Sequence, residues 1–456
     1  MSDQQKITEF SQSAEQSDSV ESNEEPDEFG WGSFGKPPED WPVSRVEELF
    51  EIQKDSADPE KLDEGELVRL YSMPAFDEGK KPELIKADDI GSKKFHVPNQ
   101  TLLFSKLNIS KKRFWLVNHS HDEPALCSTE YWPLLPADGL NLEFYLQYFN
   151  SDSFIDRPRL STSSTTNSHQ RIKSNLFDKV RLPVPPLPEQ RKIATVLYTV
   201  DRAIEKTDTI VKQTHQVKSG LMQDVFHGKH ESHQKYISTP VGDIPSHWEV
   251  ASIGDVVHTA QYGISESLSE EGQYPIFRMN NIENGYMIEE PMKYIDLEDG
   301  EFEKYQVEEG DILFNRTNSL ELVGKTGIYE LEGDHVFASY LVRLQANEKV
   351  DPYYLNYYMN SSEAQNRMMD FATKGVSQAN INANSIQQVK LPLPPLEEQE
   401  QIVKQIRSID DQIESNERYK SQLQRLKKGL RQDLLSGKVR TTDTNIEVPD
   451  EIAQHG

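Results

Sequence analysis

The sequence predicts an α/β (α+β) chain in which two mixed modules alternate with two long helices. Two observations predict this plan. Residues 182–229 recur as residues 391–438 at a constant offset of 209, and both copies have the apolar periodicity of a helix. The segments that precede the two copies contain short apolar runs separated by glycine and proline, a pattern typical of short strands and turns.

The repeat is a duplication. Leu182-Pro-Val-Pro-Pro-Leu-Pro-Glu-Gln190 recurs as Leu391-Pro-Leu-Pro-Pro-Leu-Glu-Glu-Gln399, and the alignment continues without a gap for 48 positions. More than a third of these positions are identical, against about one in sixteen expected for unrelated sequences. The preceding segments share weaker features, including Trp41 and Trp248 near the beginning of each module. The modules are therefore expected to be related as well.

Each repeat predicts one long helix. The proline run requires extended backbone, and Glu189 or Glu398 then suits a first helical turn. Gly228 and Gly437 are suitable residues for the ends of the two helices.

The apolar residues of both helices follow the narrow spacing of a coiled-coil seam. Two unrelated amphipathic helices, each packed on its own domain, remain the alternative. The predicted seam consists of Ile193, Leu197, Val200, Ile204, Val217, Leu221 and Val225 in the first helix, and Ile402, Ile406, Ile409, Ile413, Leu423, Leu426, Leu430 and Leu434 in the second.

This pattern divides the chain into seven segments. We expect an acidic disordered segment, a first module, a first repeat helix, a linker, a second module, a second repeat helix and an acidic segment. Their respective bounds are 1–36, 37–181, 182–229, 230–240, 241–390, 391–438 and 439–456.

The charge is strongly acidic. Lys and Arg number 49 against 76 Asp and Glu, which gives a formal net charge of −27. Part of it lies in the flanking segments, since residues 1–40 hold 11 acids and two lysines, and residues 439–456 hold four acids and one arginine. Both flanks have the polar composition of disordered chain. The remainder is still acidic for a nucleic-acid binder, although acidic surfaces also keep proteins soluble in very salty cytoplasm.

Other features exclude some classes of protein. No apolar stretch approaches the roughly 18 residues that a membrane helix needs, and residues 1–5 do not resemble a secretory signal. Cys127 is the only cysteine, so the chain has no intrachain disulfide and fits a reducing compartment. We expect a cytoplasmic protein.

The sequence contains no convincing catalytic constellation. It has neither a phosphate-binding loop nor a dinucleotide-binding glycine motif. Asp351-Pro-Tyr-Tyr354 is explained as a helix start with proline in the first turn. His227, His230 and His233 have a spacing that could suit a metal, but a solvated linker is the better interpretation. We therefore predict neither catalytic nor metal-binding residues.

The modules instead contain amide, aromatic and cationic side chains in loops punctuated by glycine. Arg and Lys read guanine, Asn and Gln read adenine, and such residues also contact phosphates. The candidate DNA-binding residues are Lys106, Asn108, Lys111, Lys112, Arg113 and Arg171 in the first module. In the second module they are Gln261, Tyr262, Arg278, Asn280, Asn281, Asn315, Arg316, Asn318, Lys325, Lys374, Gln378 and Asn380.

The duplicated proline-Glu-Gln motif and the helix that follows it resemble the specificity subunit of type I restriction–modification enzymes. Ile244-Pro-Ser-His-Trp248 and Gly310-Asp-Ile-Leu-Phe-Asn-Arg316 add to the resemblance, which covers residues 37–440. The first module departs from the pattern, because Gln100-Thr-Leu-Leu-Phe104 replaces the Gly-Asp-Ile-Leu-Phe motif. The resemblance is therefore weaker in the first module than in the second.

The resemblance implies two target recognition domains, alternating with two long helices that pair as an antiparallel coiled coil. It implies a non-catalytic subunit that binds a bipartite target in double-stranded DNA, one domain per half-site, together with methylation subunits, two in number, and restriction subunits. S-adenosylmethionine, ATP and Mg would serve the partner subunits, and this chain would bind no cofactor. The alternatives are a methyltransferase or nuclease fused to its own DNA reader, and a scaffold that does not bind DNA.

Overall fold

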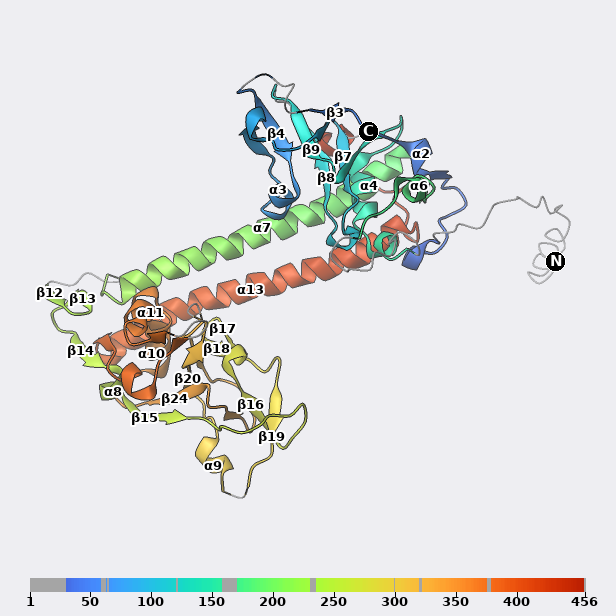
Figure 1. Cartoon of the computed structure of the whole chain (residues 1–456). Coiled ribbons are helices and arrows are strands. Elements are labelled where there is room, and N and C mark those ends of the chain that lie inside the picture. The colour runs from blue at the N-terminus through green and yellow to red at the C-terminus, as the bar shows by residue number, and fades with distance from the viewer. Residues whose placement is uncertain are drawn as a thin grey trace, which may run out of the picture. The chain divides into compact units, whose positions relative to one another are not determined.

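The computed structural model describes residues 30–454, except 59–62, 64, 120–121, 158–169, 230–234, 299, 320–321 and 375–378. The chain divides into two compact units. Unit 1 contains residues 1–204 and 422–456, and unit 2 contains residues 205–421. Two long helices, α7 (Leu187–Val225) and α13 (Leu396–Leu435), each supply residues to both units (Figure 1). No helix in the described ranges is long and apolar enough to cross a lipid bilayer.

Unit 1 contains the first module. Its strands form a four-stranded sheet of order β2-β10-β7-β8, a five-stranded sheet of order β3-β6-β9-β4-β5, and the pair β1-β11. The strands are β1 (Val43–Arg45), β2 (Phe50–Ile52), β3 (Ser56–Ala57), β4 (Leu67–Tyr71), β5 (Glu83–Lys86), β6 (Lys94–His96), β7 (Thr101–Ser105), β8 (Phe114–Val117), β9 (Ala125–Ser128), β10 (Tyr131–Pro136) and β11 (Arg181–Pro183). The helices are η1 (Gly32–Phe34), α2 (Val46–Leu49), α3 (Met73–Asp77), η3 (Ala87–Asp89), η4 (Ile109–Lys111), α4 (Leu142–Phe149), α5 (Asp152–Ile155), α6 (Ser174–Phe177) and α14 (Asp450–Ala453).

Unit 2 contains the second module. Its strands form a six-stranded sheet of order β15-β24-β20-β22-β18-β17, two three-stranded sheets of order β19-β16-β23 and β21-β26-β25, and the two-stranded pairs β14-β27 and β12-β13. The strands are β12 (Tyr236–Thr239), β13 (Gly242–Pro245), β14 (Glu249–Ser252), β15 (Val257–Tyr262), β16 (Tyr274–Phe277), β17 (Ile282–Glu283), β18 (Tyr286–Met287), β19 (Lys293–Ile295), β20 (Ile312–Asn315), β21 (Thr317–Asn318), β22 (Thr326–Ile328), β23 (Val336–Phe337), β24 (Leu341–Ala346), β25 (Thr373–Lys374), β26 (Ala379–Asn380) and β27 (Lys390–Leu393). The helices are α8 (Ile253–Val256), η5 (Met279–Asn281), α9 (Phe302–Tyr305), α10 (Pro352–Met359), α11 (Ser362–Met369) and α12 (Ala383–Ile386).

Helices α7 and α13 run antiparallel within each unit, as the resemblance implied. In unit 1, Asp201 forms a salt bridge with Lys427. In unit 2, Lys218 lies 2.5 Å from Asp410, and these two residues are the repeat counterparts of Lys427 and Asp201. The duplicated sequence therefore forms the same interhelical ion pair twice. Gly228 and Gly437 follow the helices with φ of +69° and +71°, which confirms them as residues of the helix ends.

The predicted seam is wrong at two repeat-related positions. Val217 is 61% exposed and Leu426 is 52% exposed, whereas Ile193, Leu197 and Ile406 are fully buried. The buried residues face the modules as well as the opposite helix, since they belong to the two large module cores. The periodicity of apolar residues alone does not show whether a position faces the opposite helix, a module or solvent. The predicted seam therefore included two exposed positions.

The two modules share one arrangement of strands and side chains where each connects to its repeat helix. A strand near the beginning of each module pairs with the strand that precedes the repeat helix, in β1-β11 and again in β14-β27. The indole of Trp41 donates to Glu189 at 3.1 Å, and the indole of Trp248 donates to Glu398 at 2.8 Å. The Glu of the repeated motif therefore fixes each module to the helix that follows it.

The repeated Gln has an equally structural role. Gln190 accepts from the backbone N–H of Asn141 at 2.8 Å and donates to the carbonyl of Pro185 at 2.7 Å. Gln399 makes the equivalent contacts with Asp351 and Pro394, both at 2.8 Å. Both glutamines are fully buried, so their polar atoms require these partners.

Residues 439–454, which we name the return segment, correct one expectation. A disordered acidic segment was predicted there, yet this segment packs on unit 1, and Ile452 is only 1% exposed. Lys192 donates to three of its backbone carbonyls, at 2.7–3.1 Å. Its few apolar residues were too sparse to indicate a docked segment. Residues 1–29 of the predicted N-terminal disordered segment lie outside the described residues.

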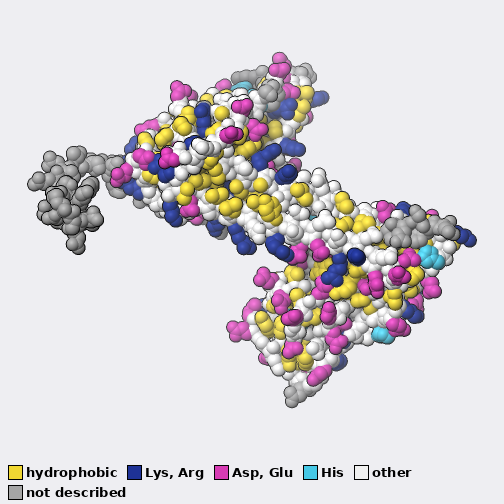
Figure 2. All heavy atoms as spheres, turned by 180° about the vertical axis from the view of Figure 1, so that it is seen from behind, with side chains coloured by type: hydrophobic (Ala, Val, Ile, Leu, Met, Phe, Trp, Pro, Cys, Tyr) yellow, Lys and Arg dark blue, Asp and Glu magenta, His cyan; other side chains and the backbone are white. Residues whose placement is uncertain are grey.

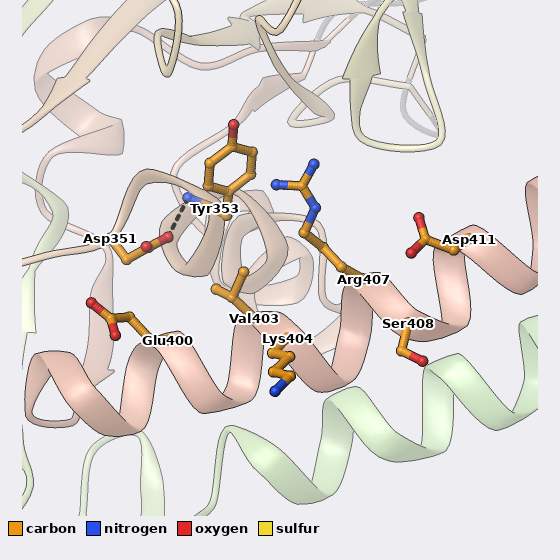
Figure 3. Close-up of a pocket in the computed structure, with 8 residues that line it drawn as sticks. All are labelled: Asp351, Tyr353, Glu400, Val403, Lys404, Arg407, Ser408 and Asp411. Atoms are coloured by element: carbon orange, nitrogen blue, oxygen red, sulfur yellow. Dashed lines mark hydrogen bonds between the residues drawn. The ribbon is translucent and has the colours of Figure 1, made fainter.

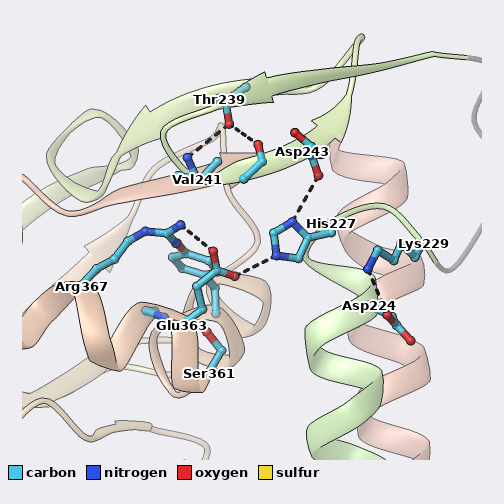
Figure 4. A network of polar contacts seen from close by, with 12 residues as sticks. Asp224, His227, Lys229, Thr239, Val241, Asp243, Ser361, Glu363 and Arg367 are labelled. Carbon is cyan, nitrogen blue, oxygen red and sulfur yellow. Dashed lines mark hydrogen bonds and ion pairs between the residues drawn. The ribbon is translucent and has the colours of Figure 1, made fainter.

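The end of α7 is fixed to the second module through His227 (Figure 4). Its Nε2 lies 3.0 Å from Glu363 on α11, and its Nδ1 lies 3.2 Å from the carbonyl oxygen of Asp243. Arg367 also contacts Glu363, at 2.5 Å. His230 and His233 lie outside the described residues, and no group of three or more potential metal ligands occurs within them.

Candidate nucleic-acid interface

A buried strand precedes a basic residue in both modules. Strand β7 is buried along its whole length and is followed by Lys106. Strand β20 is likewise buried and is followed by Arg316. Both strands have neighbours on each side in their sheets, so the residue at the end of the strand is held on a rigid base. Gln100-Thr-Leu-Leu-Phe104 therefore takes the place of Gly310-Asp-Ile-Leu-Phe314, although the motif itself is absent.

In the first module, three predicted residues lie together around this strand end. The backbone N–H of Lys106 donates to Glu130 at 3.1 Å, and its carbonyl accepts from Ile172 at 3.0 Å. Asn108 accepts from the backbone of residue 170 at 3.1 Å, which places it beside Arg171. Arg171 is exposed and forms two hydrogen bonds with Glu130, at 3.0 and 2.9 Å.

In the second module, the corresponding residues are also brought together. The backbone N–H of Arg316 donates to Tyr340 at 3.1 Å, and its carbonyl accepts from Ile381 at 2.9 Å. Asn380 precedes Ile381, and the Arg316 guanidinium donates to its side-chain oxygen at 3.3 Å. The guanidinium also stacks on the ring of Tyr262, 4.8 Å from its centroid.

The two arrangements are related by the repeat. Ile172 and Ile381 are separated by the repeat offset of 209, as are Arg171 and Asn380. The same backbone scaffold therefore presents Lys and Arg in one module and Arg and Asn in the other. These side chains favour different hydrogen-bonding edges of bases.

The Arg316 side chain is positioned but incompletely paired. Besides its contact with Asn380, it donates to the carbonyl of Ser339 at 3.3 Å. Its Nε is buried and has no hydrogen-bond partner within the described part of the chain. Asn380 is itself held, because its amide donates to Thr317 at 2.6 Å. Stacking on Tyr262 orders the guanidinium, whose two terminal nitrogens each donate one hydrogen bond and keep a second N–H.

Other cations of the first module are paired with carboxylates. Arg113 donates from Nε to Asp77 at 2.7 Å and forms a second bond to the same carboxylate. This pairing raises the pKa of Arg113 and lowers the pKa of Asp77. Lys112 forms an ion pair with Asp152, and its hydrogen bond lowers the pKa of that carboxyl. Lys111 is exposed at the end of η4.

Several predicted residues of the second module serve its own loops. Asn315 is buried and donates to Leu322, and Asn281 is buried and donates to Ile288, both at 3.1 Å. Arg278 donates to the carbonyl of Pro291 at 2.8 Å. Their side chains are thus occupied in maintaining loop shape.

The remaining predicted residues are dispersed. Gln261 is half-buried and donates to the carbonyl of Lys304 at 3.0 Å, and Asn318 accepts from the backbone of Ser319 at 2.8 Å. Asn280 and Lys325 are exposed. Lys374 lies in β25 of the small sheet that includes Asn380, and Gln378 lies outside the described residues.

One further candidate was missed by the sequence analysis. Tyr340 is 48% exposed and its backbone carbonyl accepts from Arg316, while Tyr262, on which the Arg316 guanidinium stacks, is 42% exposed. Exposed aromatic side chains provide surfaces on which bases and sugars can pack. The sequence gives no signal for Tyr340, because it lies among apolar residues that predict a buried strand.

One face of the molecule has mixed charge. On the face drawn in Figure 2, carboxylates are interspersed with lysines and arginines over both units. The predicted lysines and arginines therefore belong to a chain that is acidic as a whole. Phosphate neutralisation contributes much of the affinity for DNA, and this surface supplies little of it.

Comparison with known families gives one clear match. The family model described as the type I restriction modification DNA specificity domain matches residues 38–213 and 245–425. These two matches cover more than three quarters of the chain and correspond to the two duplicated parts.

Curated relatives agree with this match. A putative type I restriction enzyme specificity subunit, MjaX of Methanocaldococcus jannaschii, is 25% identical over 428 residues, which are 89% of this chain and 95% of the relative. The specificity subunit of the type I enzyme EcoKI of Escherichia coli is 26% identical over 271 residues, 58% of each chain.

Solved structures share the fold. A chain from a study of complex assembly in a type I restriction–modification system has a TM-score of 0.54 at 21% identity, covering 89% of this chain and all of that one. A type I restriction–modification S subunit from M. genitalium has a TM-score of 0.53 at 15% identity, covering 86% and 96%. The predicted fold class is thereby confirmed.

Proposed function

The chain belongs to the type I restriction–modification DNA specificity family, and on this premise we propose that it binds a bipartite DNA target with one module per half-site. It is a specificity subunit, which gives a restriction–modification complex its DNA specificity and is itself non-catalytic. DNA, methylation subunits and restriction subunits are its partners.

One observation carries the proposal of two half-sites. The repeat-related scaffold presents Lys106 with Arg171 in the first module and Arg316 with Asn380 in the second. A pair of cations favours guanine and phosphate, whereas Arg with Asn combines guanine and adenine preferences. Two equivalent scaffolds with different side chains fit a target whose two halves differ in sequence.

We further propose that two methylation subunits bind, related by the same duplication. Four exposed apolar residues on the repeat helices support this number. Ile210 and Tyr419 are repeat counterparts, as are Val217 and Leu426, and all four are more than a third exposed. Exposed apolar side chains at paired positions favour two copies of one partner.

The cofactors belong to the partner subunits in this proposal. S-adenosylmethionine would serve the methylation subunits, and ATP with Mg would serve the restriction subunits. The complex would act in the cytoplasm, where cellular DNA is accessible and the buried thiol of Cys127 stays reduced.

The test measures methyl transfer to unmethylated DNA that contains the sequences found methylated in the native genome. The purified chain alone should transfer no methyl groups, and the methylation subunit alone should transfer none with sequence specificity. The two together should methylate the bipartite target. Methyl transfer by the chain alone would contradict the proposal and would favour a methyltransferase fused to its own reader.

A further inference from the structure

The return segment lies in a groove of unit 1 between α4 and α7. Ile452 is buried there, and the side chain of Asn141 donates to its carbonyl at 2.8 Å. Arg191 on α7 donates to the carbonyl of Ala453 at 3.2 Å. One turn of helix, α14, is thus held by an apolar anchor and by donors from the groove wall.

A carboxylate of the return segment is held as well. The hydroxyl of Tyr198, two turns after Arg191 on α7, donates to Glu451 at 2.6 Å. This contact raises the pKa of Tyr198 to about 12, since the hydrogen bond requires the protonated phenol. The groove therefore recognises an aliphatic side chain flanked by an acid.

The duplication creates a counterpart of this groove in unit 2. Arg191 corresponds to Glu400 and Tyr198 to Arg407 through the offset of 209. Asn141 corresponds to Asp351, because both residues cap the following helix and both donate their backbone N–H to the repeated Gln. All three counterparts line one surface groove of about 530 Å³ (Figure 3).

The charges along the groove of unit 2 differ from those of unit 1. Asp351 and Glu400 form one acidic end of the groove in Figure 3, Val403 lies at its centre, and Asp411 lies beyond Arg407 at the other end. Arg407 stacks on Tyr353 at 4.6 Å and donates to Glu330 at 2.8 Å, which leaves further guanidinium donors. The chain's own return segment does not fit this groove, because Arg191, its donor in unit 1, is replaced by an acid.

We propose that this groove of unit 2 binds a short segment of a methylation subunit. The segment places an aliphatic side chain over Val403, a basic residue against Asp351 and Glu400, and an acidic residue against Arg407. The inference rests on the proposed function, and it adds that the return segment fills in unit 1 the site that a partner fills in unit 2.

The test uses the full chain and the methylation subunit, co-expressed and then titrated after purification. Glu400 is exposed, so Glu400→Arg removes the net negative charge of the acidic end without disturbing the core. We expect this variant to bind the methylation subunit at least tenfold more weakly. Gln405→Arg is the matched control, because Gln405 is exposed on the same helix and does not line the groove.

A photo-crosslinking amino acid provides the second measurement. Placed at Lys404, which lines the groove, it should capture the methylation subunit, and at Gln405 it should not. Equal binding by Glu400→Arg and wild type, with no crosslink from residue 404, would overturn the inference. Failure of the wild-type chain to bind any methylation subunit would instead contradict the proposed function.

Discussion

At the scale of single residues, DNA preference depends on which side chains occupy two equivalent scaffolds. Lys106 and Arg316 occupy the same place after a buried strand, and their neighbours Arg171 and Asn380 differ. The scaffold consists of backbone hydrogen bonds. A substitution at these four positions therefore changes the side chains proposed to contact DNA and leaves those hydrogen bonds in place. Each side chain can therefore be tested in its own half-site.

Replacing Arg316 with Ala should weaken or relax recognition of one half-site by about 1–3 kcal/mol. The reason is loss of the ordered guanidinium that stacks on Tyr262. Lys106→Ala is the matched variant and should affect only the other half-site. Mapping the methylated sites of each variant, with partner subunits present, measures the effect. Equal loss in both halves would point to a folding defect.

His227 predicts a dependence of stability on pH. The hydrogen bond to Glu363 raises the pKa of His227 above its ordinary value, against the opposing effect of burial. The stabilisation is therefore complete below about pH 6.5, the unfolded value, and is lost as the pH rises through the raised folded value.

Urea unfolding of wild type and His227→Gln at pH 6 and pH 8 measures this contribution. Wild type should lose up to about 1 kcal/mol more than the variant between these pH values. His258→Gln is the control, because His258 is an exposed histidine of the same unit. Parallel behaviour of wild type and His227→Gln would show that the contact with Glu363 does not contribute.

At the scale of elements, the repeat helices combine a predictable part with an unpredictable one. Their existence and their glycine ends follow from local sequence, because proline, glycine and apolar periodicity act within a few residues. Which apolar residues are buried depends on the modules packed against them. Val217 and Leu426 fit the periodicity as well as Ile193 does, and only Ile193 contacts a module core.

The half-buried acid of the second interhelical pair, Asp410, is expected to stabilise unit 2. Asp410 accepts from Lys218 at 2.5 Å and from the hydroxyls of Tyr357 and Tyr286 at 2.9 and 3.3 Å. Asp410→Ala leaves these donors without their acceptor, which should lower the free energy of unfolding by about 2 kcal/mol.

Urea unfolding compares this variant with Glu414→Ala, which removes an exposed pair with Arg418 on the same helix. The control should change the free energy of unfolding by less than about 0.5 kcal/mol. Similar values for the two variants would mean that the network around Asp410 adds nothing beyond a surface pair.

At the scale of the whole molecule, the duplication made the order of modules and helices predictable. The candidate DNA-binding surface was predictable only in part. Loops rich in Arg, Asn and Lys were identified from their composition. The contact of Arg316 with Tyr262 and Asn380 joins positions more than 50 residues apart, and such contacts depend on strand pairing. The docked return segment was missed because one buried Ile in a polar stretch has no periodicity.

The net charge of −27 predicts weak binding of DNA by the isolated chain. Few phosphates can be neutralised by such a surface, so the dissociation constant at about 150 mM salt should exceed about 1 μM. Addition of the methylation subunit should strengthen binding and steepen its salt dependence. Fluorescence anisotropy with a labelled target duplex measures both. Nanomolar binding by the chain alone would contradict this expectation.

The central claim is that this chain alone determines which DNA sequence its complex modifies, through two modules. Sequencing of methylated bases in cells that express the methylation subunit, with and without this chain, tests it most directly. We predict a bipartite motif with an unread gap that is present only when the chain is expressed. A continuous motif, or a motif that persists without the chain, would contradict the claim.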